Sequence, residues 1–370
     1  MSYDLLTSSG VASLVSSYKN VEQSRSITPL NTRKANYERL NSAWTGLSSR
    51  LTSLNSLITE LKDTSSASVF SAKSAKLSST AFLDVTTDRT ATAGDFSVRV
   101  QQLAKSDVIL SARMASDDSL TTMAGTHSLG FSSGDFRTSF AVTLTDAETN
   151  KTAMEKIAKA LNDDFADVTS AAIDKNTTFS GSGSFKIDMN GTETTINYDY
   201  SSGSFTYGDV IDDLVTKIGA VSGVKAEKII DGDNVSLKVT AESKAHYLSM
   251  TGTSGDLLNS GNLNINLVKE KAASSLASAS AFTPVTGSTK LSITAKNTGY
   301  DNRLIFDNKP GGSVLDFTGL TNNILQSRTT PGDDSSAGFL YTSNSITDNQ
   351  LNAKFLFNGV SIQRNSNSFS

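Results

Sequence analysis

A stripe of large apolar side chains, spaced alternately three and four residues apart, most constrains the fold of this chain. Its members are Tyr37, Leu40, Trp44, Leu47, Leu51, Leu54, Ile58 and Leu61. This spacing is typical of the a and d positions of a coiled-coil helix. The dipeptide Thr28-Pro29 offers a hydroxyl at the N-cap and a proline at the first helical position. We therefore predict that a long helix begins there and runs over about residues 29–63.

This helix needs a packing partner. Each large apolar side chain left in water forgoes about 1.5 to 3 kcal/mol, and the Ser- and Thr-rich outer face is a poor helix former. An amphipathic helix lying on its own domain is the ordinary interpretation. However, the stripe has the narrow width of a coiled-coil seam, and no second long apolar heptad follows up to Ser370. We expect the partner to be another chain or a C-terminal helix outside these residues.

A second, shorter apolar series lies upstream of the stripe. It consists of Val11, Leu14, Tyr18 and Val21, and its phase differs by two residues from that of the stripe. The break falls in the segment SRSITP. Residues 1–28 are therefore predicted to be a separate amphipathic segment that is mobile until something binds it.

Composition narrows the classes of function. A length of 370 residues suggests two to four domains, and the hydrophobic share of 37% suggests small cores. The formal net charge is −4 with no polybasic block, which argues against nucleic acid or an anionic membrane as partner. Cysteine is absent, which excludes disulfides and thiolate metal sites. The opening segment does not look like a secretory signal peptide, and no run approaches the roughly 20 apolar residues of a membrane span.

The rest of the chain shows the period of two that is typical of β-strands. Phe96, Val98 and Val100 alternate with polar residues, which predicts a half-buried strand whose neighbours could be AFLDVTTD and SDVILSARM. Two successive segments then share the order strand, strand, short helix, strand, which suggests an internal repeat. Asn190-Gly191 predicts a tight hairpin. The low-complexity stretch KEKAASSLASASAFTPVTGSTK is expected to be a linker or exposed loop.

The predicted fold class is α+β and multidomain, with an N-terminal coiled-coil helical leg followed by β-rich head domains with short helices. We expect a mobile amphipathic segment over 1–28 and the leg over 29–75. A β-rich intermediate domain would comprise 76–124 and 266–337, and a mixed β head with the repeat would span 125–265. Strands over 338–370 would return towards a missing C-terminal leg.

Catalytic chemistry has little material in this sequence. His127 and His246 are the only histidines, they lie far apart in the sequence, and cysteine is absent, so a zinc cluster or a histidine-based triad has few candidate residues. The Asp-Asp pairs at 117, 163, 212 and 333 are expected at turns or helix edges, where aspartate commonly caps or faces solvent. No enzyme activity, cofactor or metal site is predicted.

Four stretches resemble the family of flagellar filament cap proteins, also called hook-associated protein 2. They are SSGVASLVSSY, PLNTRKANYERLNSAWTGLSSRLTSL, TATAGDFSVRVQQLAKSDVILSARM and LNAKFLFNGVSIQRNSNSFS. The third is similar to a family signature strand, with Gly94, Phe96, Val98, Val100 and Leu103 as its matching positions. Family chains continue past the last motif into a helix that pairs with the N-terminal one, whereas this sequence stops at Ser370.

The resemblance implies a secreted structural protein at the distal tip of the bacterial flagellum. Its copies would form a ring-like cap that guides exported flagellin into place and prevents its loss, after leaving through the flagellar export channel. The implied partners are further copies of the chain, flagellin, a hook-associated junction protein and an export chaperone. The apolar stripe and the segment from Val11 to Val21 would make the assembly contacts.

Two other functions stay open. The chain could be a different flagellar axial protein, such as flagellin or a junction protein, although those usually place both terminal helices in the filament core. It could also be an adhesin whose head binds mucin or a host surface.

Overall fold

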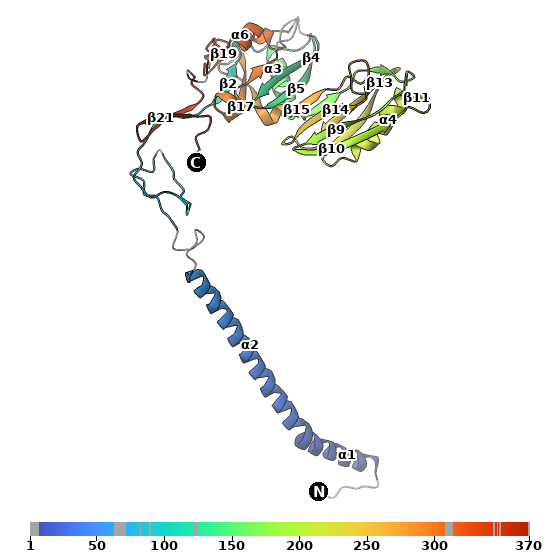
Figure 1. Cartoon of the computed structure of the whole chain (residues 1–370), viewed down its shortest axis with the longest axis vertical. Helices are drawn as coiled ribbons and strands as arrows, with labels where there is room; N and C mark the ends of the chain where they lie inside the picture. Colours follow the sequence, from blue (N-terminus) through green and yellow to red (C-terminus); the bar gives the residue numbers. More distant parts are fainter. Residues whose placement is uncertain are drawn as a thin grey trace. The chain divides into compact units, whose positions relative to one another are not determined.

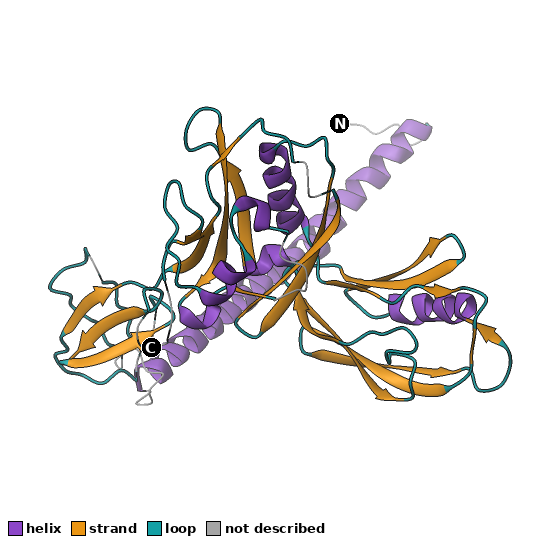
Figure 2. Cartoon of the chain, turned by 90° about the horizontal axis from the view of Figure 1, so that it is seen from above, coloured by secondary structure: helices purple, strands orange, loops and turns teal. Residues whose placement is uncertain are grey.

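The computed structural model describes residues 7–62, 72–81, 83–88, 90–120, 124–307, 314–342, 345, 347 and 349–368. The chain divides into two compact units, Met1–Asp95 and Phe96–Ser370. The first unit contains a long helix, and the second is rich in β-strands with short helices (Figures 1 and 2). This confirms the predicted α+β class.

The helix of the first unit is longer than predicted. It comprises α1 (Ser8–Glu22), the π-helical segment η1 (Gln23–Ile27) and α2 (Thr28–Lys62) without interruption. The Thr7 side chain caps its start by accepting a hydrogen bond of 3.2 Å from the Gly10 N–H. The bounds of α2 agree with the predicted helix over about 29–63. The prediction that Thr28 is the N-cap of a helix start is wrong, because Thr28 itself has helical dihedrals, φ −59° and ψ −43°, and continues from η1.

Pro29 explains why the sequence suggested a helix start. Inside a helix, a proline lacks the N–H donor, and its ring clashes with the carbonyl four residues earlier, here that of Arg25. The π-turn lies directly before it, and the Thr28 N–H donates to the Gln23 carbonyl, five residues back. This wider turn is how the helix continues through the proline, and such turns are typical places for a helix to bend.

The second unit opens with a three-stranded antiparallel sheet of order β1-β20-β21. Its strands are β1 (Val98–Gln102), β20 (Ala353–Phe357) and β21 (Val360–Arg364). The predicted neighbours of β1 are therefore wrong. The segment SDVILSARM forms a strand of another sheet, and AFLDVTTD, described except for residue 82, has no described strand.

A seven-stranded sheet of order β10-β9-β14-β15-β5-β4-β18 runs through the second unit (Figure 1). Most pairs are antiparallel, and β15 pairs with β5 in parallel. Its strands are β4 (Gly125–Ser133), β5 (Phe136–Leu144), β9 (Ser182–Met189), β10 (Thr192–Asp199), β14 (Tyr247–Ser254), β15 (Leu267–Lys271) and β18 (Ile305–Phe306).

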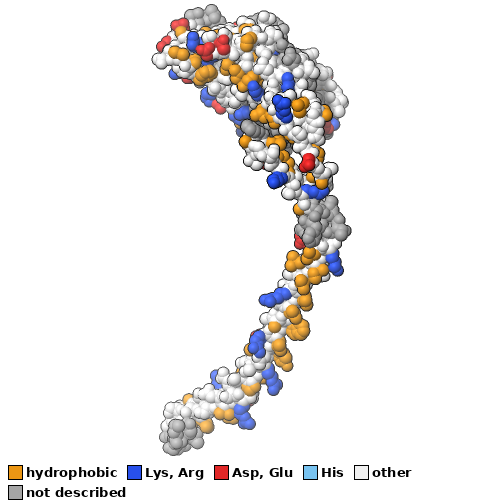
Figure 3. Space-filling view, turned by 90° about the vertical axis from the view of Figure 1, so that its left-hand side faces the viewer, with side chains coloured by type: hydrophobic (Ala, Val, Ile, Leu, Met, Phe, Trp, Pro, Cys, Tyr) orange, Lys and Arg blue, Asp and Glu red, His pale blue; other side chains and the backbone are white. Residues whose placement is uncertain are grey.

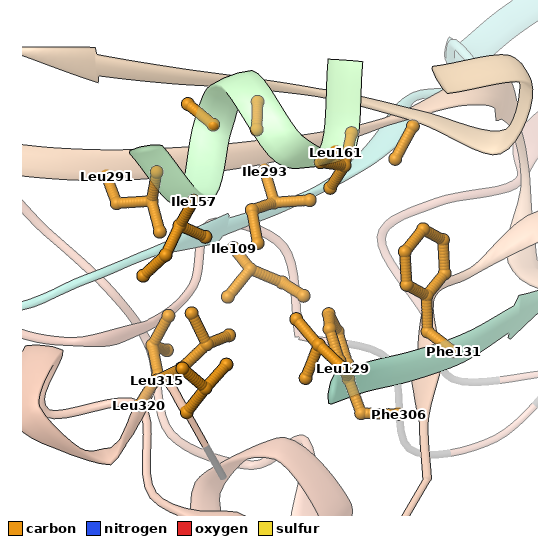
Figure 4. Packing of buried hydrophobic residues seen from close by; sticks show 14 of the residues in the cluster. Ile109, Leu129, Phe131, Ile157, Leu161, Leu291, Ile293, Phe306, Leu315 and Leu320 are labelled. Carbon is orange, nitrogen blue, oxygen red and sulfur yellow. The ribbon is translucent and has the colours of Figure 1, made fainter. Parts of the chain in front are cut away.

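The first hydrophobic core lies between α3 and two sheets. Ile157 and Leu161 of α3 pack near Ile109, Leu291 and Ile293 (Figure 4). One of the two sheets is the seven-stranded sheet. The other has the order β16-β17-β2-β19, with β3 paired to β17. The elements are β2 (Ser106–Leu110), β3 (Met114–Ala115), α3 (Asn150–Asp163), α5 (Ala273–Leu276), β16 (Ala277–Phe282), β17 (Ser288–Thr298), η3 (Tyr300–Asn302), η4 (Asp316–Thr318), α6 (Asn322–Ser327) and β19 (Gly338–Phe339).

The second core forms around α4, whose buried face includes Val210, Ile211 and Leu214. This helix packs on the sheet of order β12-β13-β6, to which β7 is added, and β8 pairs with β11 nearby. The elements are β6 (Asp167–Thr169), β7 (Ile173–Asp174), β8 (Thr178–Phe179), β11 (Phe205–Thr206), α4 (Tyr207–Gly219), β12 (Val224–Asp231) and β13 (Asn234–Ala241).

The predicted repeat is present in element order but not in packing. The first copy, β4-β5-α3, contributes to the first core, whereas β9-β10-α4-β12 belongs to the second. The residues grouped as one head over 125–265 therefore lie in two cores. The stretch expected to be a linker instead contains the end of β15, then α5, β16 and the start of β17. Ala273, Leu276, Ala277 and Ala279 pack into the first core, a role that the low complexity of the stretch did not suggest.

Candidate assembly surface

The predicted stripe is entirely exposed on α2. The exposed fraction ranges from 40% for Ile58 to 71% for Tyr37, and no residue of α1, η1 or α2 is buried. Figure 3 shows hydrophobic side chains along one side of this helix. The structure therefore brings the eight residues together as one apolar ridge without a partner in the described part of the chain.

On the side of α2 away from the ridge, threonine hydroxyls donate hydrogen bonds to the helix's own backbone. Thr45 donates to the Asn41 carbonyl at 2.9 Å, Thr52 to Ser48 at 3.0 Å and Thr59 to Asn55 at 2.8 Å. Such bonds to the carbonyl four residues back satisfy the hydroxyls but slightly destabilise a helix. Helices in proteins gain most of their stability from the packing of their apolar face. The ridge is therefore the part of α2 that is able to stabilise it.

The upstream series is exposed on α1 in the same way. Val11, Leu14, Tyr18 and Val21 are joined by Val15, which the sequence analysis missed. Leu30 and Leu57 are further exposed apolar residues on α2 that were missed. Spacing alone could have found Leu30, because it lies seven residues before Tyr37 in the same heptad position.

The predicted signature strand lies across the division between the units. Gly94 is an exposed residue at the end of the first unit, and the other positions belong to the second. Phe96 stacks on Phe357 at 5.6 Å between ring centroids. Val98 opposes Phe357, and Val100 opposes Phe355 across the strand pair.

This pairing gives the small sheet one apolar face. Val360 and Ile362 of β21 continue the two rows, because they oppose Phe357 and Phe355. The expected half-burial applies only to Val98, since Phe96, Val100 and Leu103 are exposed.

The Asp-Asp pairs turn out to have several structural roles. Asp333 accepts from the Ser335 and Ser336 N–H groups in a turn, and these bonds lower the pKa of Asp333 to about 2. Asp212 and Asp213 instead lie inside α4, where they meet Lys228 at 2.8 Å and Lys217 at 2.7 Å. The expectation of a turn or helix edge is wrong for that pair.

Two carboxyl groups near the end of α3 have strongly raised pKa values. Burial raises the pKa of Glu270 to about 7, and the nearby carboxyl groups of Asp164 and Asp167 add to this shift. The hydrogen bond from the Ser139 N–H and the charge of Arg137 oppose it. Burial also raises the pKa of Asp164 to about 6, although Asp164 accepts from the Ala273 N–H at 2.7 Å. Asp164 thus binds the backbone just beyond β15, and Glu270 binds the backbone of β5, which is a structural use of carboxyl groups.

Within the described ranges, no group of three or more His, Asp or Glu side chains could hold a metal ion. Over the same ranges, no helix is long and apolar enough to cross a membrane.

Residues 9–107 match the family model described as the flagellar hook-associated protein 2 N-terminus, which confirms the resemblance seen in the sequence. The match contains α1, α2 and β1, and therefore the whole apolar ridge and the signature strand. No curated protein sequence matches the chain.

Solved structures of flagellar cap proteins are similar to the chain at low identity. The D1-D2-D3 structure of FliD from Escherichia coli is 18% identical with a TM-score of 0.28, over 89% of this chain and 56% of that one. The chain thus spans little more than half of that structure. The D2-D3 structure from Serratia marcescens is 14% identical with a TM-score of 0.20, over 77% and 84%. FliD from Helicobacter pylori is 12% identical with a TM-score of 0.21, over 76% and 95%.

Proposed function

We propose that this chain, which belongs through residues 9–107 to the hook-associated protein 2 family, acts as a structural cap at the distal tip of the bacterial flagellar filament. The observation that carries the proposal is the exposed ridge on α2, which lies wholly within the family match. An exposed apolar patch of this length marks an interaction site.

The proposed mechanism is burial of the ridge during assembly. The helix gains stability when its apolar side chains leave water, at about 25 cal/mol for each Å² buried. Its outer face adds little stability, because serines and threonines are weak helix formers. A contact of this kind holds only while the ridge is covered. The leg is therefore able to release and rebind as flagellin subunits are added beneath the cap.

The proposed cap has several partners, and it reaches the filament tip by export. The ridge residues and the segment from Val11 to Val21 make assembly contacts. Further copies of the chain and flagellin are the proposed partners of the cap, and the cap promotes flagellin polymerisation. A hook-associated junction protein and an export chaperone are further proposed partners, and the flagellar export channel is the proposed route to the filament tip.

The test is Leu51→Asp, introduced into the chromosomal copy of the gene. Leu51 lies in the middle of the ridge and is half exposed, so the substitution costs the free chain little but places a charge in the assembled seam. We expect filaments to be lost and unpolymerised flagellin to appear in the medium, measured by electron microscopy and immunoblotting.

Ser42→Asp is the matched control, because Ser42 is exposed on the side of α2 opposite the ridge and receives the same charge. This variant is expected to support filaments of normal length. Filaments of normal length with Leu51→Asp would contradict the proposal, provided that the variant is exported in normal amount.

A further inference from the structure

We propose that the π-turn Gln23–Ile27 joins the apolar series of α1 and the ridge of α2 into one continuous face. We further infer that this face receives a single amphipathic helix with acidic flanking side chains. The inference rests on the proposed function and deepens it by naming the chemistry of a partner, and it differs from the expectation that the two series belong to separate segments.

The geometry depends on a spacing of nineteen residues. Tyr18 precedes Tyr37 by this interval, and Val21 precedes Leu40 by the same interval. In an uninterrupted α-helix each residue turns by about 100°, so nineteen residues end roughly 100° beyond five full turns. The two series would then lie on different sides of the helix.

The π-turn removes this rotation. Its hydrogen bond, from the Thr28 N–H to the Gln23 carbonyl, closes over one residue more than an α-turn does. The extra residue takes up about 100° of rotation, which is the angle that separates the two series. Tyr18 and Val21 are thereby placed in line with Tyr37 and Leu40, and Val11 with Leu30.

The charges beside the ridge favour an acidic partner. At the flanking e and g positions of α2, the only charged side chains are Lys34, Arg50 and Lys62, all of them basic. Over residues 7–62 the helix carries seven basic and three acidic side chains. The ion pair of Lys34 with Glu38 is exposed, at 3.8 Å, so it neutralises Lys34 only weakly. A second copy of this helix would place basic side chains opposite basic side chains. A partner helix with glutamates at its e and g positions would instead form favourable ion pairs.

The test uses the full chain and synthetic peptides as probes. One peptide has about seven heptads with Leu at a and d and Glu at e and g, long enough to follow both α1 and α2. A second peptide is identical but has Lys at e and g. A third has about four glutamate heptads and is long enough only for α2. Binding is measured by fluorescence anisotropy, and self-association of the chain by analytical ultracentrifugation.

Two deletion variants distinguish the effect of aligning the two apolar series from the effect of losing the π-turn itself. Both carry Pro29→Ala, so that a regular α-helix is allowed across the former break. Deletion of Ser24 in this background shortens the interval by one residue and keeps the two series aligned. Deletion of both Gln23 and Ser24 shortens it by two residues and turns α1 away by about 100°. Neither deletion changes the charge of the helix.

We expect the long glutamate peptide to bind the native chain and the single-deletion variant with similar affinity. It should bind the double-deletion variant about tenfold or more weakly, and the lysine peptide should bind the native chain about tenfold or more weakly than the glutamate peptide. The short peptide should bind all three chains equally.

Equal binding of the long peptide to both deletion variants, or loss of binding in both, would overturn the alignment. Equal affinity for the glutamate and lysine peptides, binding of neither, or self-association of the chain through the ridge would overturn the acidic partner. None of these results decides whether the chain caps filaments, because filament growth with Leu51→Asp is scored separately.

Discussion

At the scale of single residues, the most consequential contact is the buried ion pair of Asp107 and Arg328. The Arg328 guanidinium donates to the Asp107 carboxylate at 2.7 Å and also to the Leu304 carbonyl, and it lies 4.1 Å from the ring centre of Phe339. Burial raises the pKa of Asp107 even though Arg328 opposes the shift. This pair ties β2 to the segment after α6, two elements that are far apart in the sequence.

Removing one partner should therefore destabilise the first core. We expect Arg328→Gln to lower the free energy of unfolding by about 3 to 5 kcal/mol, because the Asp107 carboxylate would stay buried without its cation. Urea titration followed by far-UV circular dichroism measures this change. Lys151→Gln is the control, since it breaks only an exposed pair with Glu155 and should cost less than about 1 kcal/mol. A loss of similar size in both variants would refute the prediction.

Glu270 predicts a dependence of stability on pH. Its pKa is raised to about 7 in the folded chain, mainly by burial, so the folded state binds more protons than the unfolded state between about pH 4.5 and 7. The stability that comes from protonated Glu270 is therefore lost as the pH rises through this window.

Glu270→Gln should flatten this part of the pH profile and leave the chain more stable at pH 8 by roughly 2 to 3 kcal/mol. Urea titrations at pH 5 and pH 8 measure the effect. Glu155→Gln on α3 serves as a control with an exposed carboxyl group. An unchanged pH profile in Glu270→Gln would show that the carboxyl group is not strained by burial.

At the scale of elements, local patterns were predictable and distant pairings were not. The Asn190-Gly191 hairpin is confirmed, with both residues at positive φ and Met189 opposite Thr192. Its signal lies within four residues. By contrast, β1 pairs with β20 through Val98 and Phe357, a choice that depends on the folding of everything between them. The helix start failed for another reason, because Pro29 normally ends or begins a helix and here a π-turn accommodates it.

For the candidate surface, too, local features could be predicted from the sequence and the others could not. The spacing of the ridge was legible because the residues belong to one helix, and their exposure follows from the lack of any partner helix among the described residues. The continuity of α1 with α2 was not legible, since it depends on a turn type for which the sequence gives no simple pattern.

The start of α4 offers a prediction at this scale. The Thr206 hydroxyl accepts from the Asp209 N–H, and the Asp209 carboxylate accepts from the Thr206 N–H at 3.0 Å, which completes a capping box. Thr206→Ala should lower the free energy of unfolding by about 1 kcal/mol. Thr206→Ser keeps the hydroxyl and should be close to native. Thermal and urea unfolding test this, and equal losses in both variants would contradict a capping role.

At the scale of the whole second unit, two modest cores share one sheet. The first core contains β4 and β5 of the seven-stranded sheet, and the second contains β9, β10 and β14. The strand β15 lies between them. Its Leu267 is buried in the second core, and Ala273, just beyond its end, is buried in the first. The small residues of this region resemble those of flexible segments, and the sequence therefore suggested a linker there.

The position of β15 has a mechanical consequence. A load that pulls the two cores apart along the direction of this strand acts in shear. It strains the backbone hydrogen bonds of β15 to β14 on one side and to β5 on the other at the same time. Bonds strained together resist far more force than bonds that open one after another. In the proposed filament cap, such a strut would let the head respond to viscous load as one stiff piece.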